Sequence, residues 1–109
     1  MKHSKLFIFA IMTTLAVSGC KHQAATYPTD TLTTKNGSQL TITFFKHASL
    51  AIETEGRHIY IDPISQYADY ASLPKADLIL ITHSHYDHLD SAAVAALSTA
   101  ATTLSLIHI

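Results

Sequence analysis

The fold of this chain is decided by the stretch Leu78-Ile79-Leu80-Ile81-Thr82-His83-Ser84-His85-Tyr86-Asp87-His88-Leu89-Asp90. It opens with a continuous apolar run, which is typical of a strand buried on both faces of a sheet. The run leads directly into a loop of polar side chains that are common metal ligands. We therefore predict a central strand followed by a metal-binding loop.

The candidate metal ligands in this loop are His83, His85, Asp87 and His88. In an extended chain His83 and His85 point to the same side, and neutral imidazole nitrogens bind zinc at about 2.0–2.1 Å. Asp87 and His88 follow after the chain turns, so they can reach a second position beside the first. We expect two divalent ions, Zn²⁺ or else Mn²⁺ or Fe²⁺, because His/Asp sites accept all three. The alternative is a surface loop with incidental histidines, and the clustering of four ligand-type residues argues against it.

A first strand pair is predicted well before this loop. Asn36-Gly37 lies between residues 31–34 and the alternating run 39–45. This dipeptide is a strong hairpin signal, because both residues accept positive φ. The alternation places three apolar residues on one face of the second strand: Leu40, Ile42 and Phe44.

A second strand pair follows, with a turn at Glu55-Gly56 and a returning strand at 58–62. Pro63 ends that strand, because proline cannot donate to the ladder. Residues 64–76 form a loop, with a short helical turn at 67–73. Together with the buried run, these pairs predict a sheet with antiparallel strands.

After the metal-binding loop, Asp90 or Ser91 can cap an alanine-rich helix from 92 to about 100. The predicted class is therefore α/β: a mixed or antiparallel sheet with one following helix, in a partial domain over residues 31–103. This layout leaves one face of the sheet with too little to cover it.

The N-terminus has the pattern of an export signal. Basic residues precede the apolar run 6–17, which is too short to span a bilayer and suits a signal-peptide core. The run ends in Val17-Ser18-Gly19-Cys20, which resembles a bacterial lipobox. We predict a signal peptide at 1–19 and lipidation of Cys20; the alternative is an ordinary signal peptide with an incidental cysteine.

Lipidation would hold the mature protein on a membrane while its body stays in water. Lys21 stands where an aspartate is associated with retention in the inner membrane. We therefore expect a place in the bacterial cell envelope, on the outer membrane and facing the periplasm. Residues 20–30 show no apolar period and are predicted to form a flexible tether.

The net charge of the chain is -1, and its seven lysines and arginines are scattered. No basic patch marks a nucleic-acid partner, and we expect none. The single cysteine excludes an intramolecular disulfide. Eight histidines is a high count for 109 residues and favours metal binding.

The C-terminal segment Leu104-Ser105-Leu106-Ile107-His108-Ile109 differs in character from the alanine-rich helix before it. The same six letters arise when a transposase end sequence used in sequencing libraries is translated in one frame. We interpret residues 104–109 as a non-native tail on a truncated gene; the alternative is a genuine strand.

The histidine stretch resembles the metallo-β-lactamase fold superfamily, whose hallmark is H-x-H-x-D-H after a strand. The branch with ascorbate-phosphate lactonases and N-acyl phosphatidylethanolamine phospholipase D is the most similar. Three further matches support that branch: Lys46-His47-Ala48-Ser49, Ile59-Tyr60-Ile61-Asp62-Pro63 and Pro74-Lys75-Ala76-Asp77. The resemblance implies the N-terminal half of an αββα sandwich.

The resemblance also implies roles for individual residues. His83 and His85 would bind the first metal, and Asp87 and His88 the second, with Asp87 also orienting the nucleophile. Three further residues have weaker or competing interpretations. Asp62 would orient the metal loop by hydrogen bonds, or simply end its strand. His47 would lie near the mouth of the site, or be a loop histidine without function. Asp90 would line the pocket, or only cap the helix.

The implied function is metal-dependent hydrolysis, in which a metal-activated water attacks an ester, lactone or phosphodiester. The substrate would be a small molecule or a lipid. The family completes its metal sites with a later histidine, a bridging aspartate and a final histidine from the second half of the domain. After His88 the only histidine is His108. We therefore expect an incomplete site with little activity. The alternative is a metal-binding lipoprotein module without catalysis.

Overall fold

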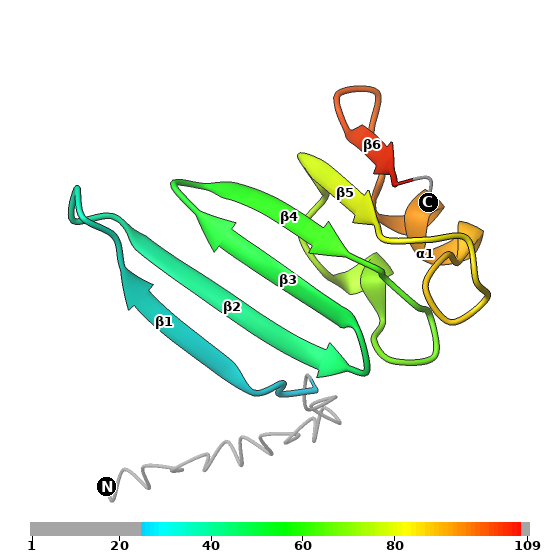
Figure 1. Cartoon of the computed structure of the whole chain (residues 1–109), viewed down its shortest axis with the longest axis horizontal. Coiled ribbons are helices and arrows are strands. Elements are labelled where there is room, and N and C mark those ends of the chain that lie inside the picture. The colour runs from blue at the N-terminus through cyan, green and yellow to red at the C-terminus, as the bar shows by residue number, and fades with distance from the viewer. Residues whose placement is uncertain (1–24, 108–109) are drawn as a thin grey trace, which may run out of the picture.

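The computed structural model describes residues 25–107, and the expected signal peptide, Cys20 and His108 lie outside these residues. Figure 1 shows one sheet with a short helix at one end. The elements are β1 (Thr29–Thr33), β2 (Gln39–Lys46), β3 (Ser49–Thr54), β4 (Arg57–Ile61), the 3-10 turn η1 (Tyr70–Ser72), β5 (Leu78–Ile81), α1 (Ser91–Leu97) and β6 (Thr103–Leu106).

The strands form a six-stranded mixed sheet in the order β1-β2-β3-β4-β5-β6. The first four strands are antiparallel neighbours, whereas β4, β5 and β6 run parallel to one another. The crossover between β5 and β6 contains α1. The α/β class predicted from the sequence, a mixed sheet with one following helix, is confirmed.

The two predicted hairpin turns are both present. Glu55 and Gly56 have φ of 49° and 73°, as a two-residue hairpin turn requires. At the other turn only Gly37 has positive φ, at 86°. There the amide of Gly37 donates to the carbonyl of Thr34. The chain uses a longer loop, between the paired residues Thr33 and Gln39, in which Asn36 does not need positive φ.

One face of the sheet packs against α1 and η1. Ile79 and Ile81 of β5 and Leu97 of α1 are 0% exposed at the centre of this core. Beside them Tyr60 donates a hydrogen bond to the carbonyl of Pro74 over 2.8 Å. Burial, together with nearby Tyr70 and Glu53, raises the pKa of Tyr60 to about 12. This core holds β4 and β5 in place below the loops that follow them.

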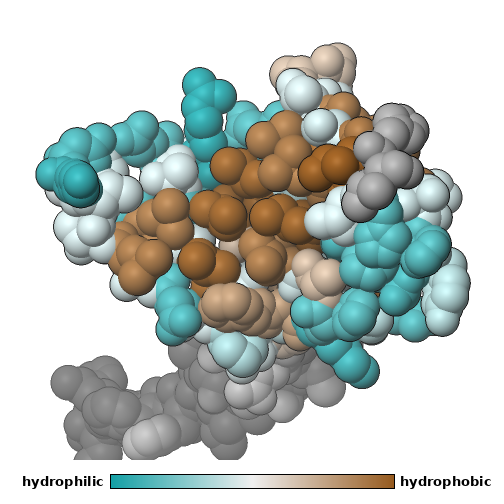
Figure 2. Space-filling view, viewed as in Figure 1, coloured by the Kyte–Doolittle hydropathy of each residue, from teal (hydrophilic) through white to brown (hydrophobic). Residues whose placement is uncertain are grey.

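The opposite face of the sheet is apolar and only partly covered. Strand register aligns two rows of side chains across β2, β3, β4 and β5: Ile42, Ile52, Ile59 and Leu78, and Phe44, Leu50, Ile61 and Leu80. Every member of these rows is half-buried or exposed, and Figure 2 shows an apolar surface across the middle of the sheet. We call these eight residues the open face. The expectation of one uncovered sheet face is confirmed.

Three expectations about the elements differ from the structure. β5 is fully buried only on the α1 side, because Leu78 and Leu80 belong to the open face. β1 starts at Thr29, inside the predicted tether, because Thr29 pairs with Thr43 on β2. α1 ends at Leu97 rather than near residue 100.

Residues 103–106 form β6 and pair in parallel with β5. This placement agrees with the alternative of a strand at the start of the C-terminal segment. The proposed non-native origin of residues 104–109 stays a prediction.

Among residues 25–107, no helix has the length and apolar character needed to cross a membrane.

Candidate metal centre

The candidate site lies where the parallel strands β4 and β5 end. Asp62 follows β4 and Thr82 follows β5, and the register pairs Ile61 with Leu80. Because the carboxyl ends of parallel strands meet at one edge of a sheet, Asp62 and Thr82 become neighbours. The turn between β2 and β3 reaches the same edge and carries His47.

Asp62 is 0% exposed and holds the base of this site. Its Oδ1 accepts a hydrogen bond from the amide of Thr82 over 2.7 Å, and its Oδ2 accepts one from the Thr82 hydroxyl over 2.6 Å. Its backbone has φ of 45°, a left-handed conformation that is uncommon for residues other than glycine. Its amide donates to the carbonyl of Leu80. A buried carboxylate in this setting fixes the start of the histidine loop.

The same carboxylate orients His88. The Nδ1 atom of His88 lies 2.7 Å from Oδ2 of Asp62. A carboxylate accepts hydrogen bonds, so Nδ1 carries a proton, and in the neutral ring Nε2 is the nitrogen with the lone pair. That Nε2 lies 3.6 Å from Oδ2 of Asp87. His88 is thereby in the tautomer that a metal ion requires, and a carboxylate behind the ring is the usual support of a metal-binding histidine.

The loop turns back on itself between His85 and His88. The amides of His88 and Leu89 both donate to the carbonyl of His85 over 2.9 Å. The rings of His83 and His85 have centroids 4.6 Å apart, and those of His83 and His88 are 3.9 Å apart. The structure therefore places the His83–His85 pair directly beside the Asp87–His88 pair.

His47 joins this cluster from the turn between β2 and β3. Its Nε2 lies 3.3 Å from Oδ2 of Asp87. One ligand atom each from His47, Asp87 and His88 all lie within 4.8 Å of one another. The structure therefore places His47 among the candidate ligands, where the sequence left its role open.

Asp87 has an electrostatic environment suited to a ligand. Loss of solvent raises the pKa of this carboxyl, but its own backbone amide and the nearby His88, His47 and His85 outweigh that effect. The net result is a pKa below the ordinary value. Asp87 is therefore ionised near neutral pH, as metal coordination requires.

Asp90 has a structural place in this region. Its Oδ1 accepts hydrogen bonds from the amides of Ala92 and Ala93, so it is the N-cap of α1. Its Oδ2 accepts a hydrogen bond from the amide of Ser65 over 2.8 Å. Both oxygens are thus engaged by backbone amides, as the helix-cap interpretation expects. Asp90 also reaches the wall of a cavity beside Asp87, so its predicted position near a pocket fits as well.

That cavity has a volume of about 140 Å³ and opens beside the candidate ligand Asp87. Its other lining residues are Ile64, Gln66, Tyr67, Tyr86 and Asp90. The Nζ atom of Lys46 lies 5.6 Å from the centroid of the Tyr67 ring. The cavity therefore lies directly beside the candidate ligand Asp87.

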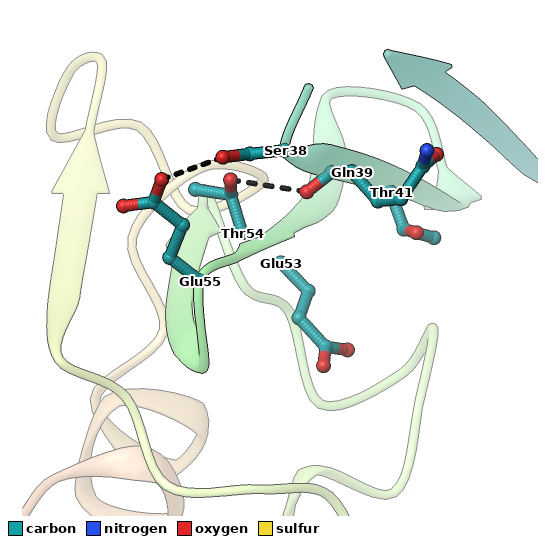
Figure 3. Close-up of a pocket in the computed structure, with 6 residues that line it drawn as sticks. All are labelled: Ser38, Gln39, Thr41, Glu53, Thr54 and Glu55. Carbon is teal, nitrogen blue, oxygen red and sulfur yellow. Dashed lines mark hydrogen bonds between the residues drawn. The ribbon is translucent and has the colours of Figure 1, made fainter. Parts of the chain in front are cut away.

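A separate cavity of about 420 Å³ lies at the other end of the β2–β3 hairpin (Figure 3). Its lining is polar: Ser38, Gln39, Thr41, Glu53, Thr54 and Glu55. Ser38 donates a hydrogen bond to Glu55, and Thr54 donates to the carbonyl of Gln39. His47 follows Thr41 by six residue steps along and just past β2, roughly 20 Å. This cavity is therefore remote from the histidine cluster.

The residues at the strand ends fit divalent metal ions. Four imidazoles and a carboxylate are the ligand types that zinc, manganese and iron share. The hydrogen bond from His88 to Asp62 leaves a bare ring nitrogen directed towards Asp87. A bare ring nitrogen and a carboxylate oxygen both accept hydrogen bonds, so these two atoms cannot bond to each other, but they can share a cation.

Two residues of this site were not singled out from the sequence. Thr82 links Asp62 to the loop, and its hydroxyl oxygen lies 3.0 Å from Nδ1 of His83. Ser49 is buried, and its hydroxyl donates to the backbone carbonyl of Asp62. The only signal for Ser49 was its place in the motif Lys46-His47-Ala48-Ser49.

Known proteins are similar to this chain in sequence. Residues 41–106 match the Beta-lactamase superfamily domain. A UPF0173 metal-dependent hydrolase of Flavobacterium johnsoniae is 51% identical over 53 residues, which cover 44% of this chain. A UPF0173 metal-dependent hydrolase of Bacillus pumilus is 41% identical over 51 residues, which cover 43% of this chain.

A solved structure shares the fold as well. The crystal structure of a Parabacteroides distasonis protein, assigned as a metal-dependent hydrolase, matches with a TM-score of 0.72 and 48% identity. The match covers 72% of this chain and 36% of that one.

The chain spans only part of these relatives. The matches cover 24% of the Flavobacterium protein and 22% of the Bacillus protein. The domain match nevertheless includes more than half of the present chain. It contains the residues of the candidate site: His47, Asp62, His83, His85, Asp87 and His88. The chain, with its partial metallo-β-lactamase fold, belongs to the β-lactamase superfamily.

Proposed function

We propose that this chain provides the first group of ligands in the metal centre of a metal-dependent hydrolase. The observation that carries the proposal is the 2.7 Å hydrogen bond from His88 Nδ1 to the buried Asp62. It makes Nε2 of the neutral ring the nitrogen that can bind a metal ion, beside the ionised Asp87. The relatives are named as metal-dependent hydrolases, and these names support the same proposal.

In this proposal His83 and His85 hold one divalent ion, and Asp87 and His88 hold a second. Zinc is the expected metal, with manganese or iron as alternatives. Divalent ions at such a centre activate water near neutral pH and offset negative charge at the reaction centre. Asp87 would accept a hydrogen bond from the attacking water and so orient it. Asp62 would keep His88 in its binding tautomer.

The proposed reaction is hydrolysis of an ester, lactone or phosphodiester. We base the finer choice of branch, near the ascorbate-phosphate lactonases and N-acyl phosphatidylethanolamine phospholipase D, on three sequence motifs. One of them, Lys46-His47-Ala48-Ser49, lies at the site, because His47 approaches Asp87 and Ser49 bonds to Asp62. The cavity beside Asp87 offers room for part of a small substrate or a lipid head group.

We further propose that Cys20 anchors the protein by lipid chains to the outer membrane, with the catalytic body in the periplasm. The support is the lipobox-like sequence Val17-Ser18-Gly19-Cys20 followed by Lys21. An anchored hydrolase would meet lipid substrates at the membrane surface. Labelling of the expressed protein with radioactive palmitate, lost in Cys20→Ser, tests the anchor.

The test of the function uses the protein with its natural continuation, assayed with lactone, phosphodiester and β-lactam substrates in the presence of Zn²⁺ or Mn²⁺. Metal-dependent turnover that disappears in His85→Ala supports the hydrolase. Tight metal binding without turnover of any substrate would favour a non-catalytic metal-binding module. For the 109-residue chain alone we expect little or no turnover, because the ion at His83 and His85 would have only two ligands from this chain.

A further inference from the structure

We propose that His47 is a third protein ligand of the metal ion held by Asp87 and His88. The inference rests on the proposed function, since it concerns the same metal centre. It adds a ligand that lies outside the histidine loop. It also implies that one ion can be held by three residues of this chain alone.

The distances within the trio match those expected around a single ion. Ligand atoms bound tetrahedrally at about 2.0–2.2 Å lie roughly 3.3–3.6 Å from one another. The distance from His47 Nε2 to Asp87 Oδ2 is 3.3 Å, and that from Asp87 Oδ2 to His88 Nε2 is 3.6 Å. The three ligand atoms lie within 4.8 Å of one another, so only a small movement closes the trio around one ion.

Of the two histidines in the trio, His47 has the side chain that is freer to move. Its side chain is 50% exposed, whereas that of His88 is 13% exposed and bonded to Asp62. Two imidazoles and one carboxylate are a common ligand set for zinc and iron, and they leave positions open for water or substrate. The fixed pair would therefore bind first, and His47 would complete the set.

The backbone at His47 adds an independent argument. Lys46 pairs with Ser49, so His47 and Ala48 form a two-residue turn. His47 has φ of 55°, at a turn position where glycine is favoured because its backbone accepts positive φ. Backbone conformations of this kind cluster at functional sites, where the surrounding structure maintains them. The backbone at His47 therefore supports a functional role for its ring.

Two substitutions separate a ligand from a turn residue. His47→Gly relieves the positive φ and removes the ring, so it should stabilise the fold and weaken metal binding. His47→Asn also tolerates positive φ, yet it offers no imidazole. The matched control is His58→Asn on β4, which removes a histidine outside the cluster.

The experiment titrates Co²⁺ into the full chain carrying His83→Ala and His85→Ala, which leaves only the His47, Asp87 and His88 trio. Affinity comes from competition with a chelator, and coordination from the visible spectrum and the hyperfine-shifted ring N–H signals. We expect His47→Gly and His47→Asn to lower the affinity by about 100-fold or more, beyond the 10–100-fold typical of supporting residues. One shifted ring signal should disappear with His47.

Unchanged affinity and an unchanged set of ring signals in both His47 variants would overturn the inference, and would leave the proposed hydrolase standing on Asp87 and His88. A loss shared equally by His58→Asn would overturn it as well. If neither this background nor the chain with His83 and His85 intact binds metal, the proposed function fails together with the inference.

Discussion

The buried carboxylate of Asp62 lies 2.7 Å from Nδ1 of His88, at the junction of two parallel strands. The same carboxylate receives the amide and hydroxyl of Thr82. One side chain therefore sets both the path of the loop and the proton position on its last histidine. The consequences of this relationship can be measured.

Asp62→Asn should keep the fold and impair metal binding. The asparagine oxygen can still accept from the amide of Thr82, but its NH₂ group would then face Nδ1 of His88. The ring proton must move to Nε2, the nitrogen directed at Asp87. We expect metal affinity to fall by about 10–100-fold, measured by zinc competition, with the tautomer of His88 read from ¹⁵N chemical shifts.

The control for this change is Asp30→Asn on the exposed strand β1. It removes one negative charge at a distance from the histidines, so zinc affinity should hardly change. A His88 that keeps its Nδ1 proton in the Asp62→Asn protein would contradict this account of the site.

Ser49→Ala should destabilise the chain more than an exposed hydrogen bond would suggest. Ser49 is buried, and without its hydroxyl the carbonyl of Asp62 loses a partner. An unsatisfied buried group costs about 1–3 kcal/mol. Urea denaturation of the metal-free chain measures the change in the free energy of unfolding.

Ser38→Ala is the matched control for Ser49→Ala. Ser38 donates to Glu55 over 2.7 Å in an exposed hydrogen bond (Figure 3). Water replaces such a partner, so the free energy of unfolding should change by less than about 0.5 kcal/mol. Equal losses in the two variants would mean that the link from Ser49 to Asp62 adds nothing to stability.

Local features of this molecule could be predicted from sequence because they depend on neighbours along the chain. Alternation assigned Leu40, Ile42 and Phe44 to one face of their strand, and Glu55-Gly56 marked a two-residue turn. The H-x-H-x-D-H pattern found the loop, and Asp90 was a candidate cap before α1. Each of these signals spans only a few residues.

Features that depend on distant contacts were missed or left open. The approach of His47 to Asp87 requires the register irregularity between Phe44 and Lys46 as well as the turn that follows. Ser49 reaches Asp62 only because β3 pairs with β4. The apolar run of β5 suggested burial on both faces, but what covers Leu80 depends on other elements, and the described residues leave it half-buried.

Asp90 should make the stability of the chain depend on pH. Burial raises the pKa of Asp90, but hydrogen bonds from Ser65, Ala93 and Ala92 outweigh it and hold the pKa below its usual value. A depressed folded-state pKa means that the ionised group stabilises the fold above the unfolded value, near pH 4, and that this contribution disappears as the pH falls through the folded value.

The substitution that tests this is Asp90→Asn. Asparagine is also a good N-cap, but it carries no titrating charge. In urea denaturation from pH 7 to pH 3, the stability difference between the two proteins should shrink below about pH 4. Asp90→Ala, which loses the cap as well, should cost about 1 kcal/mol near pH 7. A constant difference across the range would show that the ionised form has no advantage.

The open face should make residues 25–107 self-associate when no other segment covers it. Two aligned rows of partly exposed apolar side chains form a contiguous patch, and such a patch favours association. Phe44→Lys places a charge at the end of one row, where the side chain is 41% exposed. We expect sedimentation equilibrium to show less association in Phe44→Lys than in the unchanged protein.

Leu104→Lys is the matched control, because Leu104 is 53% exposed but aligns with Ile79 on the α1 side of the sheet. Leu104→Lys should leave association unchanged. Equal effects of the two substitutions would show that the added charge, and not the open face, controls association. In a longer protein whose further residues bury the open face, Phe44→Lys should be harmful instead of helpful. Burying an unpaired ammonium group is costly, so there the same substitution should lower the melting temperature, while Leu104→Lys should not.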